Sequence, residues 1–286
     1  MASISNSSFL LSAALLLLSC STSKRIVSPK TSEATSNISV SIKDSTTVDS
    51  TIIIPEKAIT IVPETSKKKK TTEKFNHTLF NKLLQKHVTA DGRVNYKGFI
   101  ANKQQLKTYL LFTSEKKPDA SWTKEDKLAF WMNVYNAYTI KLIIDNYPIK
   151  SIKDIKSPWD YRFITIDDKW YTLNDIEHKI LRKMKDPRIH FGINCASFSC
   201  PPLLNKAFTS ATVNKQLDFL AHQFINDKSR NTISENNIEV SKIFQWFTKD
   251  FKTEGTLTDY LNKYSDITIK SNAKVRYKKY DWNLNE

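Results

Sequence analysis

The sequence predicts an α+β fold: one helix-rich domain with a small, mainly antiparallel sheet, preceded by a disordered tether. Three observations predict it. From about residue 75 onwards, segments with helical spacing alternate with short runs rich in β-branched and aromatic residues. The segment 124–146 is apolar almost all round in its inner part, as expected of a helix buried inside a domain. Only 4 glycines occur in 286 residues, with no GxGxxG or P-loop pattern, so nucleotide-binding folds have no support.

The amino end, residues 1–20, resembles a lipoprotein-type signal peptide. The apolar run 9–18 is too short to span a bilayer, which needs roughly 20 residues, but it has the length of a signal-peptide core. It leads into LLSC, which resembles a bacterial lipoprotein processing site, and we expect lipid attachment at Cys20. Residues 1–8 carry no Lys or Arg, so a simple cleaved signal and an uncleaved apolar start are the alternatives.

Residues 21–74 predict a linker rich in Ser, Thr and Lys. The segment contains no glycine and no aromatic residue, and it has too little apolar surface to offset the entropy lost on ordering. Near its end stand four consecutive lysines, 67–70, which form a solvated face or contact anionic lipid or polymer. We interpret the segment as a tether between a membrane and a domain over 75–286.

The first half of the domain is predicted to be helical. Asp91 and Gly92 mark a turn between the first two helices, and Ser121 or Thr123 caps the third. The predicted helices span 75–88, 96–112 and 124–146.

The second half mixes short strands and helices. Asp167 and Asp168 predict the turn of a hairpin between two runs of β-branched and aromatic residues. The predicted elements are strands at 163–166 and 170–172, a helix over 174–185, a strand over 188–194, helices over 211–226 and 256–264, and strands near 231–240 and 275–280.

Several blocks of this sequence resemble those of domain-of-unknown-function family 547. The blocks are FWMNVYNA at 130–137, LNDIEH at 173–178, HFGINCASFSCPP at 190–202, IFQWF at 243–247 and YDWNLN at 280–285. The resemblance extends from about residue 75 to the last residue. It implies a domain that occurs in bacterial envelope lipoproteins and in larger eukaryotic proteins, and it implies no settled activity.

Two cysteines, Cys195 and Cys200, remain once Cys20 is assigned to lipid. In an oxidising compartment they predict a local disulfide. The alternatives are a reactive thiol at Cys195 and a pair of unpaired structural thiols. A thiolate nucleophile needs a base or a helix amino terminus to lower its pKa. His190 is one candidate, but a strand over 188–194 would place it on the face opposite Cys195.

Glu177 and His178 are the second pair of candidates. On the helix predicted over 174–185, Glu177 falls within the apolar arc and His178 lies near its edge. A carboxylate on a buried face is costly unless it is paired, so Glu177 either accepts structural hydrogen bonds or serves a site. His178 is the better candidate base.

Asn133 and Asn136 are polar residues within the apolar helix 124–146. They lie three positions apart on one stripe, and buried amides need partners. They either bind the backbone of the 194–202 loop or orient a histidine as the third member of a Cys-His-Asn set. The predicted polar centre therefore comprises Asn133, Asn136, Glu177, His178, His190 and Cys195.

The formal net charge is +15, from 44 Lys and Arg against 29 Asp and Glu. Most of the excess, 34 against 23, lies within 75–286. Nucleic-acid readout favours arginine, whereas this chain has 37 lysines and 7 arginines, so we exclude nucleic acid as a partner. Anionic envelope polymers or lipid headgroups fit the charge better. The 5 histidines include no HExxH, and no CxxC occurs, so we predict no metal and no cofactor.

The sequence therefore predicts a lipid-anchored protein of the bacterial cell envelope, bound to the membrane through Cys20, with its domain outside the cytoplasm. The domain is predicted to be a ligand-binding or scaffold domain. The alternative is a thiol-dependent hydrolase or transferase that acts on amide or ester bonds, with Cys195 as nucleophile and His178 or His190 as base.

Overall fold

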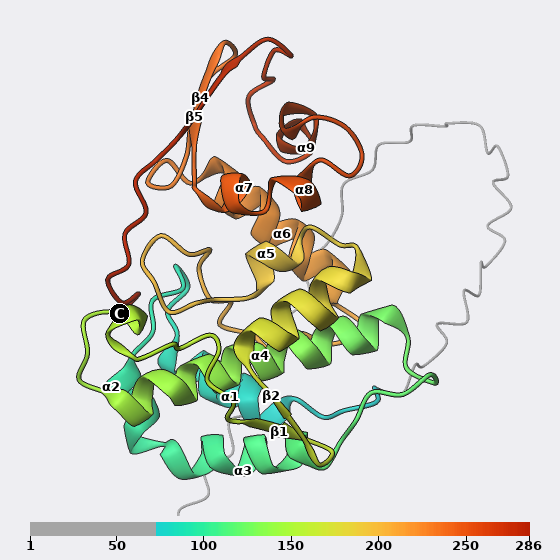
Figure 1. Ribbon diagram of the computed structural model, residues 1–286, viewed down its shortest axis with the longest axis vertical. Helices are drawn as coiled ribbons and strands as arrows, with labels where there is room; N and C mark the ends of the chain where they lie inside the picture. The colour runs from blue at the N-terminus through green and yellow to red at the C-terminus, as the bar shows by residue number, and fades with distance from the viewer. Residues whose placement is uncertain (1–72) are drawn as a thin grey trace, which may run out of the picture. The chain divides into compact units, whose positions relative to one another are not determined.

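The computed structural model describes residues 73–286, which fall within one compact unit. The predicted signal peptide with Cys20, and the linker up to residue 72, lie outside the described residues. The α+β prediction is confirmed, since helices dominate and two small sheets accompany them (Figure 1). Within 73–286, no helix is both long enough and apolar enough to cross a membrane.

Helix α4, Lys124–Asn146, is the centre of the helical half. Of the two predicted caps the structure uses Thr123, because its side chain accepts a hydrogen bond from the Asp126 N–H while the Asp126 carboxylate accepts one from the Thr123 N–H. Every residue from 128 to 140 is buried, which confirms the prediction of a helix inside the domain. Helices α2, Tyr96–Ala101, and α3, Lys103–Ser114, pack against α4, and α1, Thr78–His87, packs against α2 and α3.

The single helix predicted over 96–112 was wrong at Asn102, where α2 ends and α3 begins. The backbone of Asn102 leaves the helical region, with φ of −109° and ψ of 23°. Its side-chain oxygen pairs with His87 Nε2 at 2.7 Å. Asparagine favours such positions because its side chain competes with helical backbone hydrogen bonding.

Two small sheets accompany the helices. In the first, β1 and β2 form the predicted antiparallel hairpin, and Asp167 and Asp168 have φ of 48° and 57°, as a type I′ turn requires. In the second, β4 pairs with β3 antiparallel and with β5 parallel, so most pairings are antiparallel, as predicted. The strands are β1, Ile164–Ile166, β2, Lys169–Tyr171, β3, Thr232–Ile233, β4, Asn237–Val240, and β5, Lys274–Tyr277.

The strand predicted over 188–194 is instead a short helix, α5, Ile189–Gly192. The Asp186 carboxylate accepts a hydrogen bond from the Arg188 N–H at 3.1 Å, and the Asp186 carbonyl accepts one from the Ile189 N–H at 3.2 Å. Pro187 adds a fixed φ. The pair Asp186-Pro187 is thus a helix-start signal that outweighs the apolar run behind it.

The helix predicted over 174–185 is present but is not a regular α-helix. Residues Asp175–Leu181 form a π-helix, η2, and Arg182–Met184 form a 3₁₀ turn, η3. Thr172 fixes its start, because Asp175 N–H donates to Thr172 Oγ1 at 2.9 Å and Thr172 N–H donates to Asp175 Oδ2 at 3.0 Å. π-Helical turns are rare and occur often at functional sites.

The remaining helices lie mainly in the half of the domain that contains β4 and β5 (Figure 1). They are η1, Ile152–Asp154, α6, Val213–Asn226, α7, Ile243–Trp246, α8, Thr248–Phe251, and α9, Leu257–Asn262.

The C-terminal segment 280–285, here called the strap, runs from the β5 half back to the neighbourhood of α2 (Figure 1). It pairs with the loop that follows α5. Phe198 N–H donates to the Asn283 carbonyl at 2.7 Å, and Asn285 N–H donates to the Ala196 carbonyl at 3.2 Å. The loop is therefore held between α4 and the strap.

Asn285 is the buried anchor of the strap. Its side-chain oxygen accepts a hydrogen bond from Tyr96 Oη at 2.7 Å, and its side-chain nitrogen donates to Asn194 Oδ1 at 3.2 Å. Its carbonyl accepts a hydrogen bond from Val94 N–H at 2.8 Å. One residue thus joins the strap, the loop and the N-terminal helices.

We expect Asn285→Ala to lower the free energy of unfolding by about 1–3 kcal/mol, because it leaves the buried Tyr96 hydroxyl without its partner. Urea denaturation measures it. Asn283→Ala is the matched control, since Asn283 is exposed and contacts the loop through its backbone; its effect should stay within about 0.5 kcal/mol. Equal losses in the two variants would contradict the anchoring role of Asn285.

Candidate functional site

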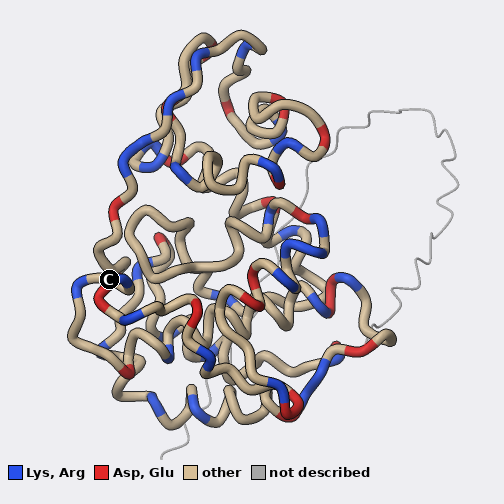
Figure 2. Tube along the Cα trace, in the orientation of Figure 1, with Lys and Arg blue, Asp and Glu red and all other residues tan. Residues whose placement is uncertain are grey.

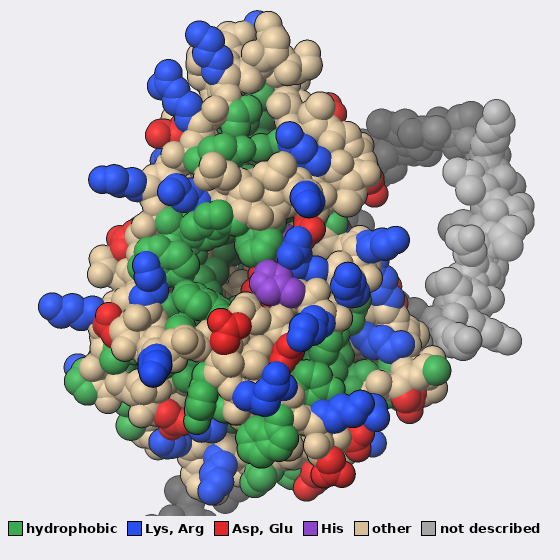
Figure 3. Space-filling model, viewed as in Figure 1, with side chains coloured by type: hydrophobic (Ala, Val, Ile, Leu, Met, Phe, Trp, Pro, Cys, Tyr) green, Lys and Arg blue, Asp and Glu red, His purple; other side chains and the backbone are tan. Residues whose placement is uncertain are grey.

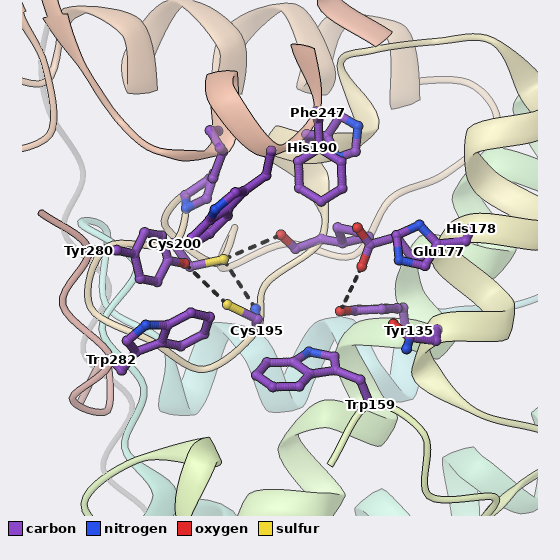
Figure 4. Close-up of a pocket in the computed structure, with 15 residues that line it drawn as sticks. Tyr135, Trp159, Glu177, His178, His190, Cys195, Cys200, Phe247, Tyr280 and Trp282 are labelled. Carbon is purple, nitrogen blue, oxygen red and sulfur yellow. Dashed lines mark hydrogen bonds between the residues drawn. The ribbon is translucent and has the colours of Figure 1, made fainter. Parts of the chain in front are cut away.

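A cavity of about 290 Å³ opens between η2, the loop after α5, α7 and the strap. Figure 3 shows a hollow bordered by hydrophobic side chains on this face of the domain, and Figure 4 shows the lining residues. The aromatic lining residues are Tyr135, Trp159, Trp246, Phe247, Tyr280 and Trp282. The other polar or reactive lining residues are Asn174, Glu177, His178, His190, Cys195 and Cys200.

Asn136 on α4 fixes the loop that carries Cys195. Its side chain donates to the Gly192 carbonyl at 2.9 Å and accepts from the Asn194 N–H at 2.9 Å. The Asn194 side chain in turn accepts from the Ala196 N–H at 2.8 Å. Ala196 has φ of 60°, a left-handed conformation that costs a non-glycine residue about 1–2 kcal/mol. Such strain persists only where the surroundings impose it, and here it turns the chain directly after Cys195.

The Cys195 sulfur lies among hydrogen-bond donors at one end of the cavity (Figure 4). The Cys200 thiol, which hydrogen-bonds to it, lowers the pKa of Cys195 most, and the hydroxyls of Ser197 and Tyr280 lower it further. The sulfur lies 3.0 Å from Ser197 Oγ and 3.4 Å from Tyr280 Oη. Hydrogen bonds to the charged form favour it, so this arrangement stabilises a thiolate.

Both cysteines are free thiols, so the disulfide considered from the sequence is not formed in this structure. Cys195 N–H donates to Cys200 Sγ at 3.2 Å. Burial raises the pKa of Cys200 well above its usual value, and the neighbouring Cys195 sulfur raises it further. The pair is therefore asymmetric: Cys195 favours the thiolate and Cys200 keeps its proton.

Glu177 lies on η2 and also lines the cavity, with its side chain buried as the sequence predicts. Tyr135 Oη on α4 donates to Glu177 Oε2 at 3.3 Å. Burial raises the pKa of Glu177 to about 7, and the nearby Cys195 sulfur acts in the same direction. Glu177 is thus a carboxyl group that holds its proton to nearly neutral pH beside a thiol that readily loses its own.

His178 and His190 are joined by an ionic network beside the cavity. Arg182 binds Asp250 through two hydrogen bonds of 2.6 and 2.8 Å, and its third nitrogen lies 3.0 Å from His178 Nδ1. His190 Nε2 pairs with Asp250 Oδ2 at 2.8 Å. Burial lowers the pKa of both imidazoles, so both favour the neutral form. Neither imidazole hydrogen-bonds to the Cys195 sulfur, and no cysteine–histidine pair is formed here.

Asn133 and Asn136 lie behind the cavity and bind backbone. Asn133 donates to the Phe208 carbonyl at 2.8 Å and accepts from the Phe208 N–H at 3.0 Å, just as Asn136 holds Gly192 and Asn194. Neither orients a histidine. Of the six predicted residues, the structure brings Glu177, His178, His190 and Cys195 to the cavity and places the two asparagines in support.

Trp246, Tyr280 and Trp282 form one side of the cavity, here called the aromatic wall, and sequence reasoning gave no role to it or to Asp250. The only sequence signal for these three residues was their place within the blocks that resemble domain-of-unknown-function family 547. Trp159 stood in no block and carried no signal. These side chains meet because the strap returns to the loop after α5, and the sequence gives no local sign of that pairing.

Residues 120–225 match the model of a family described as "Protein of unknown function, DUF547". The matched segment includes Glu177, His178, His190 and both cysteines, so the reactive groups of the cavity lie within it. No curated protein and no solved structure matched the chain.

The aromatic wall lies outside the matched segment. Trp246 follows that segment by about twenty residues, and Tyr280 and Trp282 belong to the strap. Within residues 73–286, no group of three or more His, Cys, Asp or Glu side chains is arranged to hold a metal ion.

Glu177 makes stability depend on pH. Because its folded pKa of about 7 lies above its ordinary value of 4.5, it favours the folded state at low pH, and this contribution falls as pH rises from about 4.5 to about 7. The shift corresponds to about 3 kcal/mol. We expect the free energy of unfolding of the unchanged protein to fall between pH 4.5 and 7.5 by about 3 kcal/mol more than that of Glu177→Gln. Urea denaturation at the two pH values measures both changes.

The control for this pH dependence is Glu239→Gln on β4, where the glutamate is exposed. It should follow the pH profile of the unchanged protein. If Glu177→Gln also followed that profile, Glu177 would be ionised throughout this range and the burial argument would be wrong.

Proposed function

We propose that the domain is a thiol-dependent hydrolase or transferase that acts on ester or amide bonds, with Cys195 as nucleophile. One observation carries the proposal: the Cys195 sulfur, held by the donors of Cys200, Ser197 and Tyr280, lines the same cavity as the protonated carboxyl group of Glu177. Groups whose pKa values are shifted in opposite directions within one cavity are typical of acid–base assignments in active sites.

Cys195 needs no separate base in this proposal. A thiolate is the nucleophile in cysteine chemistry, and neighbouring donors that stabilise it replace the base that activates a neutral thiol. Tyr280 remains a donor, because burial and the Cys195 sulfur raise its pKa. This differs from the expectation that His178 or His190 removes the proton.

Glu177 supplies the proton in the first step. The thiolate attacks the carbonyl carbon and forms a carbon–sulfur bond; the bond to the leaving oxygen or nitrogen breaks, and the Glu177 proton moves to that atom. In the second step the Glu177 carboxylate accepts a proton from water or an acceptor alcohol or amine. That oxygen or nitrogen attacks the thioester, the carbon–sulfur bond breaks, and the Cys195 thiolate returns.

We expect Cys195 to react with iodoacetamide at pH 7 about tenfold faster than a free cysteine, of which only a few per cent is thiolate at that pH. The dependence of the alkylation rate on pH, followed by mass spectrometry, gives its pKa. Tyr280→Phe and Cys200→Ala each remove a donor and should shift the midpoint upward. Cys200→Ser keeps a hydroxyl donor and should shift it less.

Tyr277→Phe on β5 is the matched control and should leave the midpoint unchanged, since Tyr277 lies outside the cavity lining. Incubation with p-nitrophenyl acetate should place one acetyl group on Cys195, and Glu177→Gln should slow its transfer. A quantitative disulfide between Cys195 and Cys200 in the native protein would contradict the proposal. A pKa from the alkylation rates close to that of free cysteine would also contradict it.

A binding domain without turnover is the second candidate. The observation that favours it is the aromatic lining, which suits reversible ligand binding without requiring any reaction. The acetylation experiment separates the two, because a purely binding domain leaves Cys195 unacylated while its cavity still takes a ligand.

We also propose that the chain is a lipid-anchored protein of the bacterial cell envelope, attached through Cys20 with its domain outside the cytoplasm. The apolar run before Cys20 and the lysine-bearing linker support this. Lysines and arginines are spread over the described domain (Figure 2), which is compatible with diffuse attraction to anionic lipid headgroups or envelope polymers.

Cys20→Ser should move the protein from the membrane fraction to the soluble fraction of cells that express the full chain, because the lipid is the proposed anchor. Fractionation followed by immunodetection measures this. Cys200→Ser is the matched control and should stay with the membranes. If the Cys20→Ser variant stayed in the membrane fraction but was released by 1 M salt, the attachment would depend on charge and not on a lipid, since high salt screens electrostatic attraction.

A further inference from the structure

The cavity differs in charge from the rest of the protein. Although the chain carries a formal net charge of +15, no lysine or arginine is among the residues that line the cavity. Burial keeps Glu177 protonated to about pH 7 and favours neutral imidazoles at His178 and His190. A phosphate or carboxylate group would meet no cation in the lining and would face the Cys195 thiolate. The cavity therefore disfavours anionic ligands.

One side of the cavity is an aromatic wall made by Trp246, Tyr280 and Trp282. The ring centroids of Trp246 and Tyr280 lie 4.7 Å apart, and those of Tyr280 and Trp282 lie 4.5 Å apart. Lys153 packs over Trp282 at 5.3 Å from its centroid, whereas Trp246 remains 47% exposed. Trp246 thus offers a ring surface to a ligand, a large apolar contact for a flat partner.

The other side of the cavity offers hydrogen-bonding groups that the fold does not use. His178 uses Nδ1 for Arg182, and no hydrogen bond engages its Nε2 within 73–286. Glu177, when protonated, adds a donor. A ligand hydroxyl or amide would give these groups partners.

The size of the cavity limits what it can enclose. Its volume of about 290 Å³ is just below the range of roughly 300–1,000 Å³ for small-molecule sites. It therefore accommodates a group of about one ring, with the remainder of a larger molecule outside.

We infer that the substrate is an uncharged acylated sugar, whose pyranose ring packs against Trp246 and whose acyl carbonyl reaches Cys195. A pyranose ring has a face of C–H groups that fits an aromatic surface, and it has hydroxyl groups at its edge that fit His178 and Glu177. An aliphatic acyl chain would leave those polar groups unpaired. The inference rests on the proposed function for the place of the acyl group, but binding of the ring does not require the thiol.

The test uses the Cys195→Ala variant, in which binding is separated from reaction. We expect isothermal titration calorimetry to show binding of N-acetylglucosamine oligosaccharides of one to four rings. The affinity should rise little with further rings once the added rings no longer contact the cavity or its mouth. Trp246→Ala in this background should weaken binding about three- to tenfold, the range of an aromatic contact. Trp246→Phe should recover part of the loss.

Trp170→Ala is the matched control, because Trp170 is 56% exposed on β2 and outside the cavity lining; it should leave the affinity unchanged. Glucuronic acid should bind more weakly than glucose, since its carboxylate finds no cation. Circular dichroism confirms that each variant is folded.

The outcomes separate this inference from the proposed function. Absence of binding by any of these sugars up to about 10 mM overturns the inference, even if simple esters acylate Cys195 in the unchanged protein. Stronger binding of glucuronic acid than of glucose, or an equal loss in Trp170→Ala and Trp246→Ala, also overturns it. Sugar binding that depends on Trp246 supports it, even if Cys195 proves unreactive and the proposed thiol chemistry fails.

Discussion

The clamp between the Asn136 side chain and the backbone on both sides of Ile193 is the interaction on which the site depends. It satisfies a carbonyl and an N–H that a turn inside the domain would otherwise bury without partners. Because residues 128–140 of α4 are all buried, the clamp ties the cysteine loop to the core of the domain. The left-handed Ala196 and the thiolate environment of Cys195 follow from that fixed backbone.

The site combines two opposite ways of moving a pKa. Burial alone raises the pKa of an acid, and this dominates at Glu177 and at Cys200. At Cys195, hydrogen-bond donors outweigh burial. Local geometry therefore decides which groups hold a proton, and among the lining residues Glu177, His178, His190, Cys195 and Cys200 only the Cys195 sulfur favours a charged form. The positive net charge of the protein thus does not determine the charge inside the cavity.

Much of the fold could be predicted from the sequence, because helix caps, apolar periodicity and the Asp167-Asp168 turn act locally. The errors lay where a local signal competed with packing. An apolar run at 189–193 has the composition of a strand, yet Asp186 and Pro187 start a helix there. For the site, buried polar residues on apolar faces identified Glu177 and the asparagines. The wall of Trp246 and Trp282 depends on long-range pairing by the strap, which no local pattern encodes.

The strap also determines when the site can exist during folding. The hydrogen bond between Tyr96 and Asn285 joins residues 189 positions apart. Contacts of such sequence separation form late, because the entropy of closing a long loop must be overcome before the contact contributes stability. Helices α1 to α4 can associate through shorter connections, whereas Tyr280 reaches Cys195 only after the chain has closed on itself. The contribution of Tyr280 to the environment of the thiol therefore requires the strap to be in place, whereas those of Cys200 and Ser197 come from the loop itself.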